Sequence, residues 1–291
     1  MPSFIKKNQS NSFHPPPVVI GGVGGSGTRL IAAILAKLDF YMGNDLNKAN
    51  DNLAFTLLFK QKSLWPLTEN REAIQQSIAI FLTTMYLGKP LGEYEILRVK
   101  ELAGKARLNA PEEWLQERAE KLINFHSGRR PHEPWGWKEP NTHIFLPALL
   151  DTIKGMKYIH VMRHGLDMAY SANQAQVKLW SKALTGRAVD NVTPRESFHY
   201  WCAAHRRVLD LGSDMGADFL LLNFDKLCLS PDSEMRSLLA FLDISPGPKV
   251  CQSLIDMVRR PASIGRHKDM HRLDLDPSEI DLLERLGFAA Y

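Results

Sequence analysis

Residues 18–30 of the chain read VVIGGVGGSGTRL, and the apolar stretch IAAILAKL follows directly. VVIGG is a short β-branched run that predicts a buried strand, whereas TRLIAAILAKL has apolar residues at helical spacing. Five glycines in the seven positions 21–27 separate the two. Strand, glycine loop and helix in this order are typical of a phosphate-binding loop, because the backbone N–H groups and the helix N-terminus attract an oxyanion. The alternative is a turn that only packs helix against strand.

The glycine loop departs from the nucleotide-binding pattern GxxxxGK[ST]. Gly22 and Gly27 have its spacing, but Thr28 and Arg29 stand where the pattern has Lys and Ser/Thr. A kinase that uses a magnesium nucleotide needs that lysine on the terminal phosphates and that hydroxyl on the metal. The loop therefore predicts an oxyanion site, with the hydroxyls of Ser26 and Thr28 as further donors and the source of a cation still open.

The composition is that of a folded protein with a mild positive charge. The 291 residues suffice for one large α/β domain or two small ones, and 44% of them are hydrophobic. The net charge of +4 favours an anionic ligand without requiring nucleic acid. Cys202, Cys228 and Cys251 are widely spaced, which argues against a disulfide framework or a zinc site. Without an apolar run typical of a signal peptide or a membrane span, the sequence predicts a cytoplasmic protein.

Strand and helix patterns alternate along the rest of the chain. Residues 1–16 are polar and end in prolines, which predicts a flexible arm. Residues 45–130 have helical patterns and no convincing strand, which predicts a helical insertion or lid within one domain of residues 17–291. A loop is expected at 129–137, strands at 156–162 and 218–224, and helices at 165–176, 194–212 and 231–244. This alternation predicts an α/β fold with a doubly wound, mostly parallel sheet.

A second candidate anion site is the stretch MRHGLDMAYS, where the strand expected at 156–162 ends. Arg163 ends that strand, and Ser171 follows eight residues later on the helix expected next. Ligands collect at the C-terminal ends of parallel strands, so Arg163 would share an edge of the sheet with the glycine loop. A guanidinium and a hydroxyl suit a phosphate group, although Arg163 alone could equally pair with an acid such as Asp167.

Together these stretches resemble the sulfotransferases that use 3′-phosphoadenosine 5′-phosphosulfate (PAPS). Residues 22–30 resemble the family's loop GxxRSGTT for the 5′-phosphosulfate, and Arg163 with Ser171 resembles its pair for the 3′-phosphate. LLLNFDKLCLSPDSEMRSLLAFLDI, residues 220–244, resembles the segment RYEDL…P…LLxFLG. SIGRHKD, residues 263–269, resembles the GR/RKG loop that closes on the 3′-phosphate. The four blocks occur in the family's order.

The resemblance spans residues 17–270 in scattered blocks and implies a P-loop-like nucleotide site. It implies transfer of a sulfuryl group from PAPS to a hydroxyl or amine by in-line displacement, without a metal. The acceptor would be a small molecule, a glycan or a lipid, with no nucleic acid and no indication of the oligomeric state. The residues that it assigns to PAPS are Gly24, Gly25, Ser26, Gly27, Thr28, Arg29, Arg163, Ser171, Phe224 and Arg266.

Gly25 stands where the family's loop carries the Arg or Lys that steadies the departing phosphate. Lys138, in GWKEPNT, resembles the KDP lysine of some members and is expected to be the main cation, with Arg29 as helper. The alternative for Arg29 is a solvated helix residue. Phe224 replaces the tyrosine of the RYED block, so adenine could still stack on the ring without that tyrosine's polar contact.

The general base is less clearly indicated. Family members use His, Glu or Asp near the loop after the first helix, which makes Asp45 the first candidate and Asp51 and His126 the reserves. Asp45 equally suits a helix N-cap. Glu139, next to Lys138, could orient that lysine or be structural.

Three other functions compete with sulfuryl transfer. VMRHG resembles the opening of the histidine phosphatases, in which His164 would be the nucleophile, although that motif normally stands near the N-terminus. A P-loop kinase with a degenerate loop would use Asp225 as a metal ligand, and Gly25 leaves open a nucleotide-binding domain without catalysis. The helical stretch 45–130 and a loop expected at 180–195 are the parts of the sequence that least resemble a nucleotide-binding fold. They are the expected walls of the acceptor site.

Overall fold

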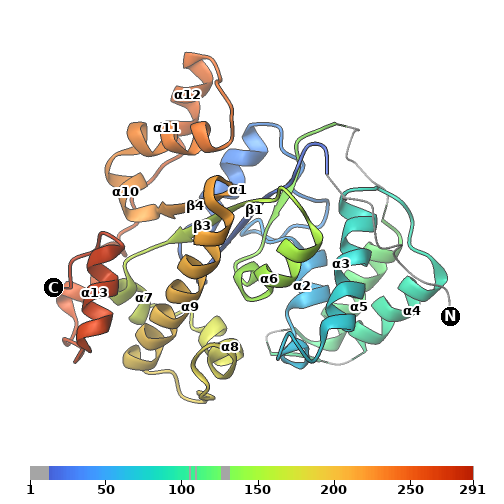
Figure 1. The fold of residues 1–291 in the computed structure, drawn as a ribbon, viewed down its shortest axis with the longest axis horizontal. Helices are drawn as coiled ribbons and strands as arrows, with labels where there is room; N and C mark the ends of the chain where they lie inside the picture. The colour runs from blue at the N-terminus through green and yellow to red at the C-terminus, as the bar shows by residue number, and fades with distance from the viewer. Residues whose placement is uncertain (1–12, 105, 109, 126–131, 291) are drawn as a thin grey trace.

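The computed structural model describes residues 13–104, 106–108, 110–125 and 132–290. Within these residues its centre is a sheet of four parallel strands in the spatial order β2-β1-β3-β4 (Figure 1). The strands are β1 Val18–Gly22, β2 Gly136–Lys138, β3 Lys157–Met162 and β4 Phe219–Asn223. The chain goes from β1 to β2 on one side and then crosses to β3 on the other. The predicted doubly wound α/β fold is confirmed.

Alternate side chains of β1 enter two different apolar cores, one on each face of the sheet. Val18 and Ile20 belong to one core, and Val19 belongs to the other. Val19 lies in register with Trp137 of β2 and Tyr158 of β3, which share its core. Because both faces are covered, these strands read as nearly continuous apolar runs rather than alternating ones.

Helices cover both faces of the sheet (Figure 1). The Val18 face packs against α1 Thr28–Lys37, α10 Phe224–Leu229, α11 Pro231–Phe241 and α12 Pro248–Ile255. The Val19 face packs against α6 Thr142–Thr152, α7 Gly165–Ala169, α8 Ala175–Thr185, α9 Pro194–Met215 and α13 Pro277–Arg285. The 3₁₀ turns η2 Gly216–Asp218 and η3 Arg266–Asp269 connect these elements. No helix of the described residues is long and apolar enough to cross a membrane.

The predicted helical region lies beside β2 and shares the core of the Val19 face. Its elements are α2 Leu53–Phe59, η1 Lys62–Leu64, α3 Arg71–Met85, α4 Glu93–Ala103 and α5 Glu112–Ile123. The described residues between 45 and 130 form no strand, as expected. Phe55 and Phe81 contact Trp137 of β2, with ring centroids 6.0 and 5.0 Å away. This aromatic cluster packs the helical region against β2, the outermost strand of the sheet on that side.

Several predicted boundaries are wrong. The loop expected at 129–137 contains the first two residues of β2, whose three residues are too few to show a pattern of their own. The helix expected at 165–176 is broken, because α7 ends at Ala169 and α8 begins only at Ala175. Ser171 therefore lies in the turn between these helices. Of the loop expected at 180–195, only residues 186–193 lie outside α8 and α9.

Part of the predicted N-terminal arm packs against the protein. Residues 1–12 lie outside the described residues. Phe13 is buried and meets the ring of Tyr86 edge-on at 4.8 Å. The indole N–H of Trp135 donates to the carbonyl of Pro15 at 2.9 Å. These contacts tie residues 13–16 to the helical region and to the start of β2.

Candidate functional site

The C-terminal ends of the four parallel strands meet at one edge of the sheet, where open α/β sheets bind ligands. Gly22 ends β1 and begins the glycine loop, and Lys138 ends β2. Arg163 directly follows β3, and Asp225 lies two residues beyond β4. The edge therefore gathers the glycine loop, Lys138 and Arg163, although they are far apart in the sequence.

The glycine loop is closely packed and has free hydrogen-bond donors. Gly25 and Gly27 have φ angles of 94° and 99°, in the left-handed region that favours glycine. A Cβ on Gly27 would lie 2.2 Å from the ring of Phe224, so only glycine fits there. Ser26 is buried, and its Oγ has no hydrogen-bond partner among the described residues. A buried hydroxyl without a partner is costly, so this one fits an oxyanion held by the loop.

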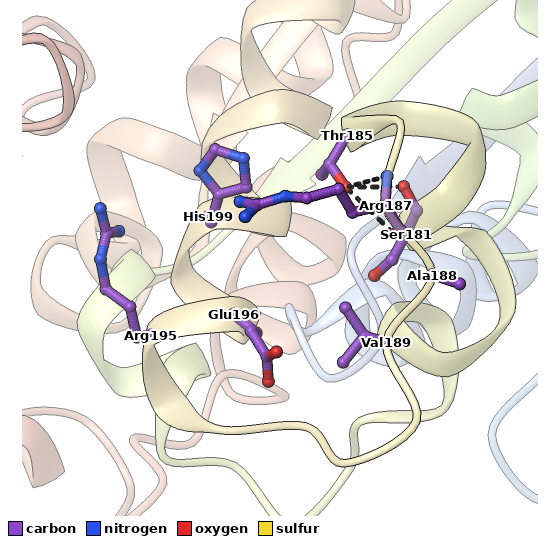
Figure 2. Close-up of a pocket in the computed structure, with 8 residues that line it drawn as sticks. All are labelled: Ser181, Thr185, Arg187, Ala188, Val189, Arg195, Glu196 and His199. Atoms are coloured by element: carbon purple, nitrogen blue, oxygen red, sulfur yellow. Dashed lines mark hydrogen bonds between the residues drawn. The ribbon is translucent and has the colours of Figure 1, made fainter.

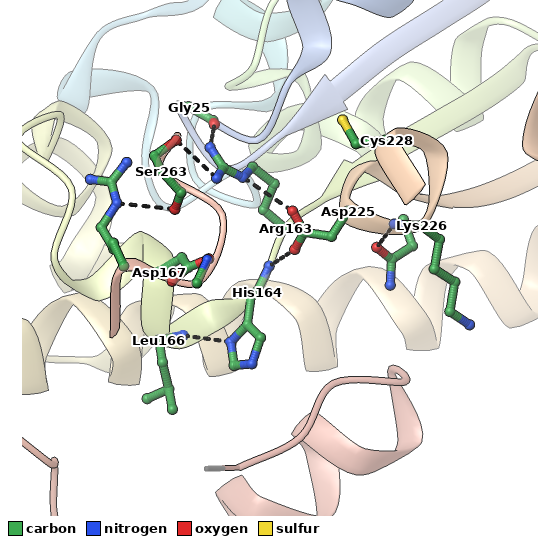
Figure 3. Close-up of polar contacts among 12 residues, drawn as sticks. Gly25, Arg163, His164, Leu166, Asp167, Asp225, Lys226, Cys228 and Ser263 are labelled. Carbon is green, nitrogen blue, oxygen red and sulfur yellow. Dashed lines mark hydrogen bonds and ion pairs between the residues drawn. The ribbon is translucent and has the colours of Figure 1, made fainter. Parts of the chain in front are cut away.

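Arg163 joins three strand ends in one polar network (Figure 3). Its Nη1 donates to the carbonyl of Gly25 at 3.5 Å, and its Nη2 donates to Ser263 Oγ at 3.1 Å. Its Nε lies 3.5 Å from Asp225 Oδ1 in an ion pair, so its acidic partner is Asp225 and not Asp167. The guanidinium also lies over the ring of Phe224, 5.6 Å from the centroid. The strand end, the glycine loop and the 263–269 segment thus share one buried cation.

Ser171 and Arg266 lie beside the same loop. A Cβ built on Gly25 would lie 4.0 Å from Ser171 Oγ, so this hydroxyl faces the loop. The Oγ of Ser171 accepts the backbone N–H of Asn173 at 3.2 Å. Arg266 Nη1 donates to the carbonyl of Tyr170, next to Ser171, at 3.2 Å. The structure therefore brings together the residues predicted for the 3′-phosphate, with Ser171 held by a turn rather than by a helix.

Asp167 was not predicted as a site residue, yet it holds the 263–269 segment in place. Its carboxylate accepts the backbone N–H groups of Gly265 and His267, at 2.7 and 3.0 Å, and lies 2.6 Å from His267 Nδ1. Burial would raise the pKa of Asp167, but these hydrogen bonds lower it overall. The spacing from Arg163 to Asp167 indicates only that both follow β3, and the distant partner could not be seen in the sequence.

His164 is a structural part of this network. Its backbone N–H donates to Asp225 Oδ2 at 2.8 Å (Figure 3). Its ring stacks on that of His267, with ring centroids 4.2 Å apart. Its Nε2 lies 2.9 Å from the carbonyl of Ala289. Burial and the neighbouring His267 lower the pKa of His164 to about 4. Both ring nitrogens have partners, since Nδ1 accepts the N–H of Leu166 at 3.3 Å.

Lys138 is buried at the end of β2 and faces the 47–51 turn. Its Nζ donates to the carbonyl of Ala49 at 3.0 Å and forms an ion pair with Asp51. Asn47 shapes the turn, because its Oδ1 accepts the backbone N–H groups of Ala49 and Asp51 at 2.8 and 2.9 Å. The amide of Asn50 donates to the carbonyl of Arg29 at 3.4 Å. The turn therefore links Lys138 to the start of α1.

Asp45, the first candidate for the base, points to a different neighbour. Its Oδ1 lies 3.3 Å from Arg118 and 3.4 Å from Lys121, both on α5. It is not the N-cap of α2, because Asn52 holds that position and accepts the N–H of Phe55 at 3.0 Å. The carboxylate that meets Lys138 is Asp51, a reserve candidate. His126, the other reserve, lies outside the described residues.

Glu139 is a second buried carboxylate beside Lys138. It accepts the backbone N–H and the side-chain amide of Asn141, at 2.6 and 2.8 Å. Burial and the nearby Asp51 raise its pKa, while the ammonium of Lys60 opposes the shift. Trp180 in turn donates to Asn141 Oδ1 at 2.8 Å, which fixes this arrangement from α8. The Glu139 carboxyl thus lies in the same region as Lys138 and Asp51.

Two predicted site residues have surroundings that bear on their roles. Arg29, on the first turn of α1, is exposed, and its side chain has no hydrogen bond or ion pair with other described residues. Phe224 is buried between Gly27 and Arg163 and contributes to the core of the Val18 face. Its ring supports the glycine loop. Whether adenine also stacks on it stays a prediction, as does the catalytic part of Arg29.

Three buried histidines, His143, His160 and His205, lie on the Val19 face of the sheet. The ring of His160 lies 5.9 Å from that of His143 and 5.2 Å from that of His205, edge to face in both cases. Burial lowers the pKa of His143 to about 3 and that of His205 to about 4. Gln176 connects this group to the loop, because its amide donates to the carbonyl of Gly22 at 3.1 Å. Its other end lies 3.5 Å from His143 Nε2.

Two cavities lie against α8. Leu179 lines one of about 560 Å³, and Ser181 and Thr185 line another of about 360 Å³ (Figure 2). Positions 179 and 181 project from opposite sides of a helix, so α8 separates the cavities. Figure 2 shows that the side chain of Arg195 points away from the smaller cavity. This arginine forms ion pairs with Asp276 and Glu279. The described residues contain no group of three His, Cys, Asp or Glu side chains that could hold a metal ion.

Comparisons with known proteins identify the family of this chain. The model of the Sulfotransferase family matches residues 16–246. The sulfotransferase domain of the Synechococcus PCC 7002 olefin synthase has a similar structure, with a TM-score of 0.52 and 17% identity over 97% of this chain and 98% of that domain. The sulfotransferase domain of the curacin biosynthetic pathway gives a TM-score of 0.49 and 13% identity over 95% and 99%. No curated protein matches the sequence. The family model covers most of the chain, and the chain belongs to the sulfotransferase family.

Proposed function

We propose that the protein transfers a sulfuryl group from PAPS to the hydroxyl or amine of an acceptor. The observation that carries this proposal is the convergence of Gly25, Arg163 and Ser171 at one edge of the sheet. The acceptor oxygen attacks sulfur as the bond from sulfur to the 5′-phosphate oxygen breaks. A sulfate ester and adenosine 3′,5′-bisphosphate are formed, and the acceptor proton passes to a protein base.

The glycine loop would hold the 5′-phosphosulfate. The buried Ser26 Oγ and the start of α1 supply hydrogen bonds and a partial positive charge without a metal. Arg163, Ser171 and Arg266 would hold the 3′-phosphate. Arg163 already has three protein partners, so the ligand would take the place of some of them.

Lys138 would supply the cation that Gly25 cannot, with Arg29 as helper. It is 3% exposed, and in such surroundings a positive charge stabilises a departing phosphate more than it does in water. In the ligand-free structure its charge is paired with Asp51. Binding of the phosphosulfate by Lys138 would release that carboxylate.

We place the general base at Asp51 rather than at Asp45, because Asp51 lies at Lys138 while Asp45 is paired with Arg118 and Lys121. The Asp51→Asn and Asp45→Asn variants test this choice. We expect Asp51→Asn to lower kcat by two decades or more, within the range of ~10²–10⁴ for a general base, with bisphosphate affinity unchanged. A larger loss of kcat in Asp45→Asn would return the role to Asp45.

The alternatives are less well supported by the geometry. His164 has partners at both ring nitrogens and at its stacked face, which disfavours a nucleophilic histidine. Asp225 accepts the N–H of His164 and pairs with Arg163, which disfavours it as a metal ligand in a kinase. A nucleotide-binding domain without catalysis differs only in turnover, so activity decides that case.

Calorimetric titration tests the donor. We expect adenosine 3′,5′-bisphosphate to bind with micromolar affinity and magnesium ATP to bind much more weakly. Binding of magnesium ATP alone would favour the kinase, and binding of neither would remove the nucleotide site. If the bisphosphate binds, release of the bisphosphate from PAPS with a panel of alcohols then separates the enzyme from a silent binding domain.

A further inference from the structure

The cavity of about 560 Å³ lies between the helical region and α8, and no strand contributes to its lining. Its walls come from the end of α2, from η1, from α3 and α4, and from Leu179 of α8. Small-molecule sites usually have volumes of roughly 300–1,000 Å³. The cavity is therefore large enough for a metabolite. It lies apart from the glycine loop and from the strand ends that form the proposed nucleotide site.

The charges that line this cavity are mostly positive. Lys60, Lys62, Arg98 and Arg107 line it, and Glu101 is the single acidic residue among the described lining residues. Arg98 pairs with Glu101 at 2.6 Å, so the one negative charge is already compensated. Three cations, Lys60, Lys62 and Arg107, remain around one open cavity. Because like charges repel, an anion in this space would lower the electrostatic energy.

Of the cations that line this cavity, Lys60 and Lys62 are the two whose ammonium groups are unpaired among the described residues. Neither Lys60 nor Lys62 has a side-chain hydrogen bond or ion pair with another described residue. Arg107, by contrast, donates to the carbonyl oxygens of Leu57 and Leu102. Burial lowers the pKa of Arg107 to about 10, which still leaves it charged at neutral pH. The lysines are available to a ligand, while Arg107 supports the wall behind them.

The remaining lining is partly apolar. Leu64, Leu102 and Leu179 are all buried and line the cavity. An apolar wall beside free cations suits a ligand that joins a hydrocarbon or aromatic body to a negatively charged group. The smaller cavity beyond α8 lacks this excess, because the carboxylate of Glu196 offsets Arg187 there and Arg195 is paired with Asp276 and Glu279.

Helix α2 gives the distance between this cavity and the transfer site. At its start, the N–H of Asn52 donates to the carbonyl of Lys138 at 2.8 Å. Lys60 follows its last residue, and the seven residues between them span ~10 Å at 1.5 Å per residue. The charge of Lys60 also acts on Glu139, next to Lys138. A ligand of modest length could reach from the lysines to the buried charges at the end of β2.

We propose that this cavity binds the anionic end of the acceptor. The acceptor is then an alcohol that carries a carboxylate or phosphate on an apolar body, with hydroxyl and anion separated by about the length of α2. This inference rests on the proposed sulfuryl transfer for the identity of the ligand as an acceptor. The charge and shape of the cavity support binding of such an anion independently of turnover.

The test is a calorimetric titration of the intact protein with ω-hydroxydecanoate and with the uncharged decanediol of equal length. We expect the hydroxy acid to bind and the diol to bind at least ~10-fold more weakly, as for loss of one charge-assisted contact. Lys62→Glu should remove this preference. Lys100→Glu is the matched control, because Lys100 is exposed on α4 and does not line the cavity. Equal binding of acid and diol, or an unchanged preference in Lys62→Glu, would overturn the proposal.

Turnover with PAPS extends the same test. A series of ω-hydroxy carboxylates should show an optimum of kcat/KM at one intermediate length, and Lys62→Glu should raise KM with little change in kcat. Bisphosphate binding without any preference for the acid would reject the cavity proposal and leave the transferase function intact. Charge-dependent binding of the acid by a protein that does not bind the bisphosphate would support the anion site in the cavity and reject the transferase function.

Discussion

The edge of the sheet and the cavity of the helical region both carry positive charge, but they differ in how that charge is satisfied. At the edge, Arg163 has partners on the glycine loop, on the 263–269 segment and on α10, directly after β4. In the cavity, Lys60 and Lys62 have no such partner among the described residues. One region is a connected network, and the other is a set of separate charges.

This difference indicates two kinds of recognition. A network whose members bond to one another holds its geometry before the ligand arrives, which suits a donor with fixed phosphate positions. Separate lysines on flexible stems adapt to ligands of different shape, which suits an acceptor site. Changes at the edge should therefore affect folding and catalysis, whereas changes in the cavity should affect mainly the choice of acceptor.

Gly27→Ala should have the largest effect, because it breaks the connected region at its tightest contact. A Cβ there would lie 2.2 Å from Phe224 on a residue with φ of 99°, so we expect a loss of about 3 kcal/mol of unfolding free energy. Gly186→Ala is the control, since its φ is 77° but no atom lies within 4 Å. Urea denaturation measures both, and equal losses would mean that the Phe224 contact is unimportant.

Lys138→Ala tests the residue that joins the two regions. We expect kcat to fall by two decades or more, about 2.7 kcal/mol, with bisphosphate affinity mostly intact. Lys157→Ala is matched, because Lys157 also lies on a strand and pairs with an aspartate, Asp243, but at the opposite edge of the sheet. Steady-state kinetics with PAPS check both variants, and near-normal turnover would remove Lys138 from the mechanism.

Arg163→Ala should weaken the donor site rather than the transfer step. Loss of a charge-assisted contact should reduce bisphosphate affinity by about 2 kcal/mol, measured by calorimetry. The exposed pair of Arg71 with Asp151, at 3.8 Å, supplies the control variant Arg71→Ala. Unchanged affinity in Arg163→Ala would contradict the assignment of this residue to the nucleotide.

The buried histidines should make stability depend on pH. His143 and His205 are neutral in the folded protein, because burial lowers their pKa from 6.5 to about 3 and about 4. The unfolded chain binds protons below pH 6.5 and the folded chain does not, so stability should fall as pH decreases from 6.5 toward 4. The slope for one histidine approaches about 1.4 kcal/mol per pH unit.

Denaturation curves across this pH range measure the slope, with His205→Gln as the comparison. The variant should be less sensitive to pH even if it is less stable overall. An identical slope in both proteins would mean that His205 does not contribute to the pH dependence.

Local patterns predicted much of the fold. VVIGG, KYIHVM and FLLLN show their strands because each is a β-branched or apolar run; the first two are almost entirely buried, and FLLLN is partly buried. Strand β2 was not predicted from the sequence, because its three residues form a strand only by pairing with β1.

Site residues divide in the same way. The glycine loop could be predicted from its run of glycines between a strand and a helix. Arg163 could be predicted from its position at the end of a strand. The partners of the charges could not be predicted. Asp51 meets Lys138 across 87 positions, and Asp167 meets His267 across 100. Such pairs depend on how the sheet and its helices pack, which no local pattern contains.

By itself, the sequence determined three of the four strands, the helical character of residues 45–130, the glycine loop and the resemblance to sulfotransferases, because these depend on residue types at short spacing. Only the tertiary structure decided that Asp51, rather than Asp45, meets Lys138, that a turn presents Ser171 to Gly25, and that two free lysines face a cavity. Parallel strands bring their ends to one edge whatever their separation in the chain, so folding selects which distant residues share a site.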